Sequence, residues 1–352
     1  MVGKTKVEII KRDTIKPSSP TPSKEISVRS LKENTAVECD ADGAPYVESK
    51  FNGLLSTFLE KPDEEELKRL FPARVESPEA AEGPLLLVEA TFFDCGGLAV
   101  AVCASHKLVD AATLRMFLKA WAAFALGCGK KVVPDLNDAA SQFPPKDQPL
   151  QPHAADVKQP TRVEAVTALV WKCATIASRL NSSSSNQNSI LAQLVNFRKR
   201  VEPLFPENSV GNLLGYFVVQ VNHDEHEPKV EELVAKLRNG INIYKENHVS
   251  KLRGDGAIDK ISQGAKEGGD FVRREDVNLF VCSSWCKFDF YEVDFGWGRP
   301  IWATIQGSCY ENMITLLDTR EGGGVEVCLT LSKENMTSFE RDPELLAFAS
   351  SN

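Results

Sequence analysis

The clearest hydrophobic pattern in the chain consists of two apolar runs separated by a short polar turn. Residues 85–93 (LLLVEATFF) and residues 98–104 (LAVAVCA) are almost continuously apolar, and Asp-Cys-Gly-Gly lies between them. Short apolar runs that contain β-branched and aromatic residues and are bounded by glycine favour strands buried on both faces. The pattern therefore predicts a buried β-hairpin over residues 85–104.

Three longer stretches have helical character. Residues 111–126 (AATLRMFLKAWAAFAL) form an apolar run that ends at glycine, which commonly stops a helix. Residues 162–180 follow Thr161, and Glu164 lies three places after this threonine, which is the pattern of a capping box. Residues 230–247 repeat apolar positions with the helical period. We therefore predict a helix over each of these three ranges.

The remaining patterned runs predict shorter elements. A short acidic helix capped by Asp63 is expected near residues 62–70, and short helices are expected after Ser332. Further strands are predicted at residues 6–12, 35–39, 46–51, 191–197, 213–222 and 278–283, with a hairpin at 313–317 and 325–331. An Asp-Gly turn lies between the strands at 35–39 and 46–51. This mixture of hairpins and helices predicts an α/β fold with mixed β-sheets.

A long polar segment divides the chain. With 352 residues the chain is long enough for about two domains. Residues 134–160 are rich in proline, glutamine and aspartate and show little periodicity, as linkers do. We therefore predict a first domain over residues 1–133, a linker over 134–160 and a second domain over 161–352.

Composition and charge exclude several classes of function. The chain carries 41 basic and 49 acidic residues, a net charge of −8, which argues against a nucleic-acid-binding surface. Its apolar runs are shorter than the roughly 18 residues of a membrane span, and residues 1–12 lack the apolar segment of a signal peptide. The nine cysteines and five histidines are not spaced like metal ligands. We therefore expect free thiols, a cytosolic location, no metal and no membrane partner.

The candidate chemistry begins directly after the predicted buried hairpin. Residues 105–110 read SHKLVD and lie where a strand ends and a helix starts, a position from which ligands are often bound. An imidazole there, that of His106, can accept a proton near neutral pH, and Asp110 can fix the turn. The spacing is common by chance, so a structural histidine is the alternative to a catalytic one.

A second segment, taken with the first, resembles the signature of an enzyme family. Residues 283–300 read SSWCKFDFYEVDFGWGRP, and residues 105–122 read SHKLVDAATLRMFLKAWA. The segment at 105–122 resembles the HxxxD motif of the BAHD acyltransferases of plants, and the segment at 283–300 resembles their DFGWG motif. The two motifs follow each other along this chain in the same order as in the family. The resemblance extends over most of the chain, including the opening VEIIKRDTIKPSSPTP and the ending FERDPELLAFAS. It is greatest to the vinorine-synthase-like group, which acetylates alcohols of the alkaloid, terpenoid and other specialised-metabolite classes.

The resemblance implies a fold and a reaction. The fold would consist of two chloramphenicol-acetyltransferase-like domains, each a mixed β-sheet flanked by helices, with a channel between them. Acyl-CoA, most simply acetyl-CoA, would be a co-substrate rather than a bound cofactor, and the acceptor would be a small-molecule alcohol. His106 would deprotonate the acceptor hydroxyl, which then attacks the thioester directly, so no acyl-enzyme forms. The enzyme would act as a monomer without a nucleic-acid partner.

The resemblance also assigns residues to roles. Ser283 would donate a hydrogen bond to the oxyanion, and Trp285 would line the acceptor side of the channel, with plain core packing as its alternative. Asp110 would pair with Arg198, or alternatively with Arg200, and so hold the histidine loop. Asn212 would lie near the channel as a substrate-binding residue, with a turn as its alternative. The DFGWG loop would be structural; its residues are Asp294, Phe295, Gly296, Trp297 and Gly298.

The sequence departs from the family pattern in two places. After residues 20–23 a strand and a long helix of the family are missing, and a strand and a helix are missing again near residues 159–160. We therefore expect an incomplete first domain with few helices to cover its buried strands. This departure leaves an alternative function, a truncated relative that binds a ligand or is defunct and does not catalyse acyl transfer.

Overall fold

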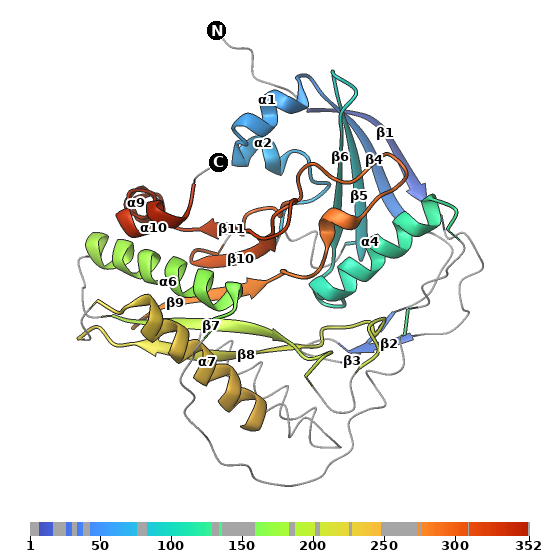
Figure 1. Ribbon diagram of the computed structural model, residues 1–352. Helices are drawn as coiled ribbons and strands as arrows, with labels where there is room; N and C mark the ends of the chain where they lie inside the picture. Colours follow the sequence, from blue (N-terminus) through green and yellow to red (C-terminus); the bar gives the residue numbers. More distant parts are fainter. Residues whose placement is uncertain are drawn as a thin grey trace.

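The computed structural model describes part of the chain. It describes residues 7–16, 26–29, 34–37, 43–75, 83–128, 134–135, 159–182, 187–200, 205–224, 227–247, 274, 276–308 and 310–350. The predicted linker at 134–160 lies mostly outside the described residues. The described elements form two larger β-sheets with helices against them, together with a separate two-stranded ribbon (Figure 1).

The first sheet is built from the first half of the chain. Its strands are β1 (Val7–Ile15), β4 (Ala44–Phe51), β5 (Leu86–Phe93) and β6 (Leu98–Ala104), in the order β1-β4-β5-β6. The predicted hairpin is confirmed, because β5 and β6 pair antiparallel from Leu86 opposite Ala104 onwards. Strand β4 runs parallel to β5 and antiparallel to β1, so the sheet is mixed, as expected.

The two strands that flank the Asp-Gly turn in the sequence pair with other strands. The strands predicted on either side of the Asp-Gly turn do not pair with each other, since β3 (Asn34–Val37) pairs with β2 (Ile26–Arg29) and β4 pairs with β1. Gly43 has φ +82°, and a Cβ atom there would lie 2.1 Å from the Ile15 carbonyl oxygen. This glycine therefore permits the close approach of the end of β1, a long-range contact that local turn chemistry does not reveal.

The second sheet is built from the second half of the chain. Its order is β11-β10-β9-β7-β8, and its central strand β9 runs parallel to both neighbours. The strands are β7 (Asn188–Asn196), β8 (Leu214–Val221), β9 (Val277–Ser284), β10 (Met313–Asp318) and β11 (Val325–Thr330). The antiparallel pairing of β10 with β11 confirms the predicted C-terminal hairpin.

Helices cover the second sheet and create the larger core. They are α6 (Arg162–Asn181), α7 (Val230–Asn247), α9 (Lys333–Phe339) and α10 (Pro343–Phe348). Helix α6 contributes Trp171 to a core cluster that also contains Phe280 of β9 and Ile314 of β10, and all three residues are fully buried. The predicted capping box is present, because the Thr161 hydroxyl accepts from the Glu164 backbone and the Glu164 carboxylate accepts from the Thr161 backbone.

The first sheet has a smaller described core. Helices α1 (Leu55–Glu60) and α2 (Glu64–Lys68) are short, and Asp63 caps α2 as predicted. Phe51, Phe58, Leu70 and Phe93 form the buried cluster beneath them. Helix α4 (Ala111–Ala125) is the longest described helix in this half, and Gly127, at φ +66°, follows its end.

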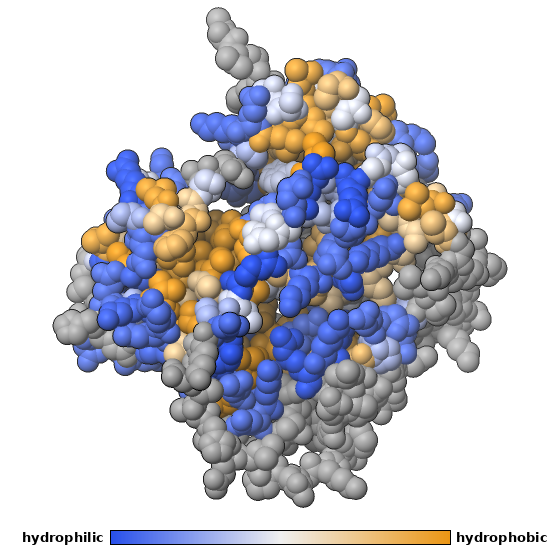
Figure 2. Space-filling view, in the orientation of Figure 1, coloured by the Kyte–Doolittle hydropathy of each residue, from blue (hydrophilic) through white to orange (hydrophobic). Residues whose placement is uncertain are grey.

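Apolar side chains of the first sheet remain in contact with solvent. Ile10 is 60% exposed, Phe92 41% and Val100 38%. Figure 2 shows apolar residues gathered on the upper part of the molecule, over this sheet. Apolar surface left in water forfeits about 25 cal/mol per Å² of burial energy. Among the described residues, few helices therefore cover the first sheet. That particular strands and helices of the family are missing stays a prediction.

A segment of the second half packs on the first half. Trp302 lies with its ring centroid 6.4 Å from that of Phe58, and the side chain of Gln306 accepts a hydrogen bond from the Val75 backbone. The two halves are therefore joined by direct contacts beyond the linker, and the exact domain bounds stay a prediction.

Glu89 on β5 gives a test of the packing of the first sheet. The residue is 5% exposed, and its carboxylate accepts a hydrogen bond from the Ser49 hydroxyl. Burial raises the pKa of Glu89 above its ordinary 4.5, although Ser49 and Arg12 act in the opposite direction. A raised pKa in the folded state means that stability falls as the pH rises through that pKa.

Glu89→Gln should therefore stabilise the protein at pH 8 by about 1 kcal/mol, because the amide keeps the hydrogen bond without a buried charge. The gain should be smaller at pH 5 than at pH 8, because burial raises the pKa of Glu89 and so favours its protonation as the pH falls. Thermal unfolding at both pH values measures it. Glu231→Gln, at an exposed position in the first turn of α7, should show no such pH dependence. An equal gain at both pH values would contradict the raised pKa.

Candidate active site

His106 lies on a tight turn between strand β6 and helix α4. The backbone N–H groups of Leu108 and Val109 both donate to the Ser105 carbonyl, at 3.0 and 3.2 Å, and close the turn. The Leu108 side chain is buried and anchors the turn, whereas His106 is exposed. The imidazole is therefore displayed to solvent on a turn whose backbone is fixed, which suits a group that exchanges protons.

Asp110 ends this turn and begins the helix. Its side chain caps α4 by accepting from the Thr113 backbone N–H at 2.9 Å. The other carboxylate oxygen accepts from the Leu213 backbone N–H at 3.1 Å, and the residue is only 4% exposed. A buried carboxylate needs such partners to offset the loss of water. Asp110 thus links the start of α4 to the segment before β8.

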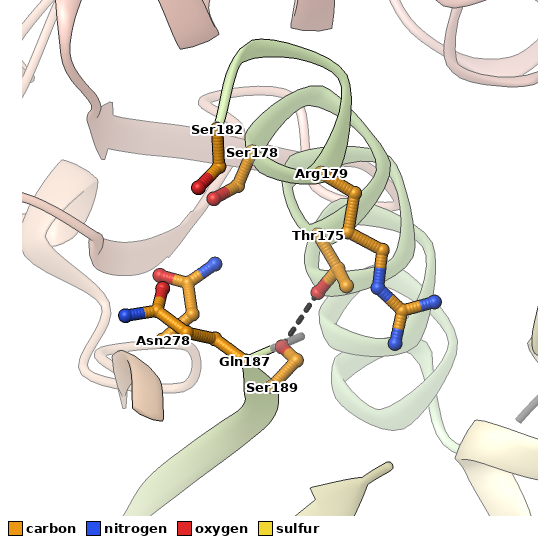
Figure 3. Close-up of a pocket in the computed structure, with 7 residues that line it drawn as sticks. All are labelled: Thr175, Ser178, Arg179, Ser182, Gln187, Ser189 and Asn278. Atoms are coloured by element: carbon orange, nitrogen blue, oxygen red, sulfur yellow. Dashed lines mark hydrogen bonds between the residues drawn. The ribbon is translucent and has the colours of Figure 1, made fainter. Parts of the chain in front are cut away.

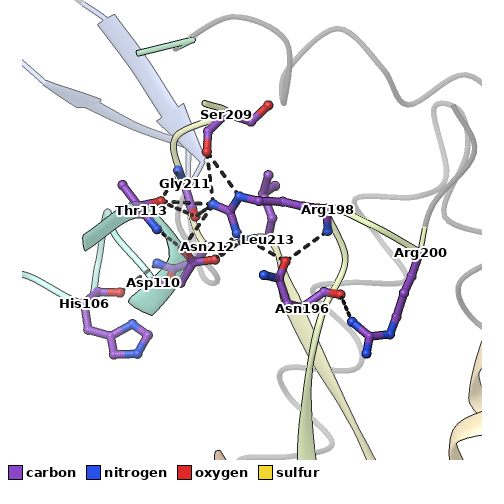
Figure 4. A network of polar contacts seen from close by, with 10 residues as sticks. All are labelled: His106, Asp110, Thr113, Asn196, Arg198, Arg200, Ser209, Gly211, Asn212 and Leu213. Atoms are coloured by element: carbon purple, nitrogen blue, oxygen red, sulfur yellow. Dashed lines mark hydrogen bonds and ion pairs between the residues drawn. The ribbon is translucent and has the colours of Figure 1, made fainter. Parts of the chain in front are cut away.

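Arg198 completes the pairing of this carboxylate. Its two terminal nitrogens lie 2.6 and 3.1 Å from the two oxygens of Asp110, a bidentate ion pair that is buried on both sides. Arg200, the alternative partner, donates instead to the Asn196 backbone carbonyl. Arg198 is therefore the residue that pairs with Asp110, and Figure 4 shows the pair at the centre of a polar network.

The network around Arg198 includes groups that the sequence did not single out. The guanidinium also donates to the backbone carbonyls of Ser209 and Gly211. The Thr113 hydroxyl accepts from Arg198 at 3.0 Å and donates to the Gly211 carbonyl at 3.2 Å. Thr113 lies one turn after Asp110 on α4, and this spacing was the only signal for it in the sequence. Residues of both halves thus surround one buried ion pair.

Asn212 reaches the histidine turn from the same segment. Its side-chain N–H donates to the His106 backbone carbonyl at 2.7 Å. In Figure 4 the imidazole itself points away from the network, and no contact joins the ring to the other residues drawn. The structure therefore brings His106, Asp110, Asn212 and Arg198 together, with the ring left free of this network.

Ser283 and Trp285 lie at the end of strand β9. The Trp285 indole N–H donates to the Ser283 hydroxyl oxygen at 3.2 Å, and the Trp285 backbone N–H donates to the Leu316 carbonyl. The indole also packs on Phe290, with ring centroids 5.5 Å apart. The Ser283 hydroxyl accepts from tryptophan and so keeps its own hydrogen to donate. Trp285 therefore orients Ser283 and is itself half-buried.

The DFGWG loop is held by its own aspartate. One carboxylate oxygen of Asp294 accepts from the backbone N–H groups of Gly296 and Gly298, at 2.7 and 3.0 Å. Both glycines have φ +101°, a conformation that side chains other than glycine rarely adopt. These contacts give the aspartate and the two glycines definite roles in the backbone conformation, and they make the loop a local structural unit.

Aromatic and charged contacts join this loop to helix α4. Phe295 packs edge-on against Trp121 of α4, with ring centroids 4.8 Å apart, and stacks on Trp297. Just before the loop, Asp289 pairs with Arg115 and Lys119 of the same helix. Figure 1 shows this segment of the second half alongside α4. The loop therefore fastens the helix that follows the His106 turn.

Asp294→Ala should lower the soluble yield and the unfolding temperature, because two loop N–H groups lose their acceptor, at a cost of about 1–3 kcal/mol. Asp294→Asn is the matched variant, since its amide oxygen can still accept both bonds and should preserve most of the yield. Expression level and thermal unfolding measure the difference. An alanine variant that folds normally but does not turn over would contradict the structural role.

Other kinds of site find little support in the described residues. Burial raises the pKa of Cys282 to about 12, so this thiol near Ser283 stays protonated and is no nucleophile. No group of three or more metal-binding side chains occurs in the part of the chain that the structure describes. Within that part, no helix is both long and apolar enough to cross a membrane.

Two cavities lie away from the His106 turn. One, of about 10 Å³, is polar, lies between the end of α6 and the starts of β7 and β9, and includes Arg179 and Asn278 (Figure 3). That volume holds about one water molecule. The other, of about 340 Å³, lies beside α2 and includes Lys68 and Arg74. Neither cavity is lined by a residue that the sequence analysis assigned to the catalytic or substrate-binding site.

Comparisons with known proteins agree with the geometry. The Transferase family matches residues 25–156 and 151–346. Akuammiline synthase 1 of Alstonia scholaris is 32% identical, over 91% of this chain and 80% of its own length. A limonoid 7-O-acetyltransferase of Citrus sinensis is 30% identical, over 91% of this chain and 79% of its own.

A solved structure supports the same relationship. The crystal structure of vinorine synthase superposes with a TM-score of 0.81, at 25% identity, covering 99% of each chain. The two mixed sheets and their helices are therefore the fold of that enzyme. With the family match over both halves and relatives that are named acyltransferases, the chain belongs to the BAHD family of acyl-CoA-dependent acyltransferases.

Proposed function

We propose that this protein transfers an acetyl group from acetyl-CoA to a hydroxyl group of a plant specialised metabolite, with His106 as the general base. Acyl-CoA is the co-substrate of the family. One relative is named a limonoid 7-O-acetyltransferase, and another is named an akuammiline synthase. The observation that carries the proposal is the His106 turn, where an exposed imidazole stands on a backbone fixed by a buried ion pair.

The reaction follows from the groups at the site. His106 takes the proton of the acceptor hydroxyl, and the oxygen attacks the thioester carbonyl carbon. The tetrahedral intermediate carries the negative charge on the former carbonyl oxygen, to which the Ser283 hydroxyl donates. The carbon–sulfur bond then breaks, and the imidazolium returns its proton to the leaving thiolate of CoA. No covalent enzyme intermediate is needed because both substrates meet directly.

Each half of the chain contributes to this arrangement. His106 comes from the first half, and Ser283 and Arg198 come from the second. One chain therefore supplies every group that the proposal uses, and we propose that the enzyme works as a monomer in the cytosol. Trp285 would shape the acceptor side by keeping Ser283 in place.

The decisive experiment measures thiol release from acetyl-CoA by the purified chain across a panel of alkaloid and terpenoid alcohols. The expected result is release that depends on an acceptor and yields the acetyl ester, identified by mass spectrometry. The alternative, a non-catalytic relative, is favoured by the exposed apolar side chains of the first sheet. It predicts no thiol release with any acceptor, although a ligand could still raise the unfolding temperature.

A further inference from the structure

We propose that Asn212 is a positioning residue that fixes the backbone of His106, and not a substrate-binding residue. The inference rests on the proposed role of His106 as general base. It begins from one contact, the hydrogen bond of 2.7 Å from the Asn212 side-chain nitrogen to the His106 carbonyl. The two residues are 106 positions apart in sequence and belong to different halves of the chain.

The backbone on both sides of Asn212 is itself fixed. Before it, the Gly211 carbonyl accepts from Arg198 and from the Thr113 hydroxyl. After it, the Leu213 N–H donates to Asp110. Gly211 and Leu213 are buried. The asparagine side chain therefore projects from a rigid strap, residues 209–213, that lies across the start of α4, so its reach to His106 does not depend on a mobile loop.

The orientation of the amide follows from its surroundings. A flipped amide would place its oxygen against the His106 carbonyl oxygen, and two acceptors repel. The amide oxygen exposes less than 1 Å² and accepts no hydrogen bond from the residues that the structure describes. An enclosed oxygen cannot receive a substrate hydroxyl, which argues against the substrate-binding role expected from the sequence. The amide nitrogen is then the functional end of the side chain.

This contact matters because the imidazole has little other support. Across the described ranges, no hydrogen bond to the His106 ring is present, and the ring is exposed. The direction of the ring is thus set by the backbone of the turn. Within the turn, the Ser105 carbonyl accepts two backbone hydrogen bonds, and from the other half of the chain Asn212 donates to the His106 carbonyl. A displacement of about 1 Å at a reacting group can cost about 100-fold in rate. Loss of the Asn212 bond would release the carbonyl and, with it, the ring.

Asn212→Asp tests the inference, because the carboxylate has nearly the same shape but turns the donor into an acceptor that faces a carbonyl. We expect kcat to fall about 10- to 100-fold, with the KM for acetyl-CoA and for the alcohol changed less than about 2-fold. Asn212→Ala removes the donor without a new charge and should give the same pattern if the aspartate variant folds poorly. Thermal unfolding monitors folding of each variant.

A matched control lies at the last residue of helix α6. The Asn181 side chain also donates to backbone carbonyls, those of Ala177 and Glu334, at 3.0 and 3.1 Å. Asn181→Asp should lower the unfolding temperature while leaving kcat within about 2-fold. An Asn212 variant that raises KM at constant kcat would overturn positioning in favour of substrate binding. One that changes only stability would overturn it in favour of a structural role.

The same assays separate this inference from the proposed function. If His106→Ala loses activity while both Asn212 variants keep nearly normal kcat, the positioning inference fails and the general base stands. If His106→Ala keeps its activity, the proposed function itself fails, whatever the Asn212 variants do.

Discussion

His106→Ala should lower kcat by about 10²–10⁴-fold, the usual contribution of a positioned general base. The acceptor hydroxyl would then have to lose its proton to water as it attacks the thioester. The KM for acetyl-CoA should change little, because the imidazole acts on the proton of the acceptor. The unfolding temperature should also change little, since the side chain is exposed and buries little apolar surface. Steady-state thiol release, with thermal unfolding beside it, measures both effects.

His223 provides the matched control for this variant. It follows strand β8, and its ring contacts the Asn188 side chain at 3.3 Å, on an exposed part of the second half. His223→Ala removes the same kind of side chain from the same protein and should leave kcat unaffected. A His106 variant with a rate close to that of the His223 variant would show that the imidazole is not the base.

Local sequence chemistry predicted many elements and their ends. Thr161 and Glu164 predicted a helix start because a capping box satisfies backbone donors within four residues, and the structure contains it. Asp63 likewise predicted the start of α2, and the glycine after α4 predicted the end of that helix, because both features depend on nearby groups only. The hairpin of β5 and β6 was predictable because both strands lie within one short stretch.

Contacts between residues far apart in the sequence were harder to predict from the sequence. The pairing of β1 with β4 joins strands separated by 28 residues, whereas the two strands predicted on either side of the Asp-Gly turn do not pair. Local propensity cannot distinguish such pairings, since either one satisfies the same strand. At the site, the pairing of Asp110 with Arg198 followed only from the family resemblance. The roles of Thr113 and Asn212 depend on contacts across the two halves, which single-sequence patterns do not encode.

Asp110→Ala should lower the free energy of unfolding by about 3–5 kcal/mol. The reason is the guanidinium of Arg198, which is 4% exposed and would stay buried without its carboxylate. The change also removes the cap of α4 and the acceptor of the Leu213 N–H. Because domains are typically stable by about 5–15 kcal/mol, this loss is large. Equilibrium unfolding in urea, followed by tryptophan fluorescence, measures it.

Two companion variants separate the causes of that loss. Asp110→Asn keeps a good helix cap, so it should lose less than alanine while still leaving the guanidinium without its counter-charge. The double variant Asp110→Ala with Arg198→Met removes both charges and should be more stable than Asp110→Ala alone, because no unpaired charge remains buried. A double variant whose loss equals the sum of the two single losses would mean that the pair is not coupled. A loss below about 1 kcal/mol for Asp110→Ala would contradict burial of the pair as the structure shows it.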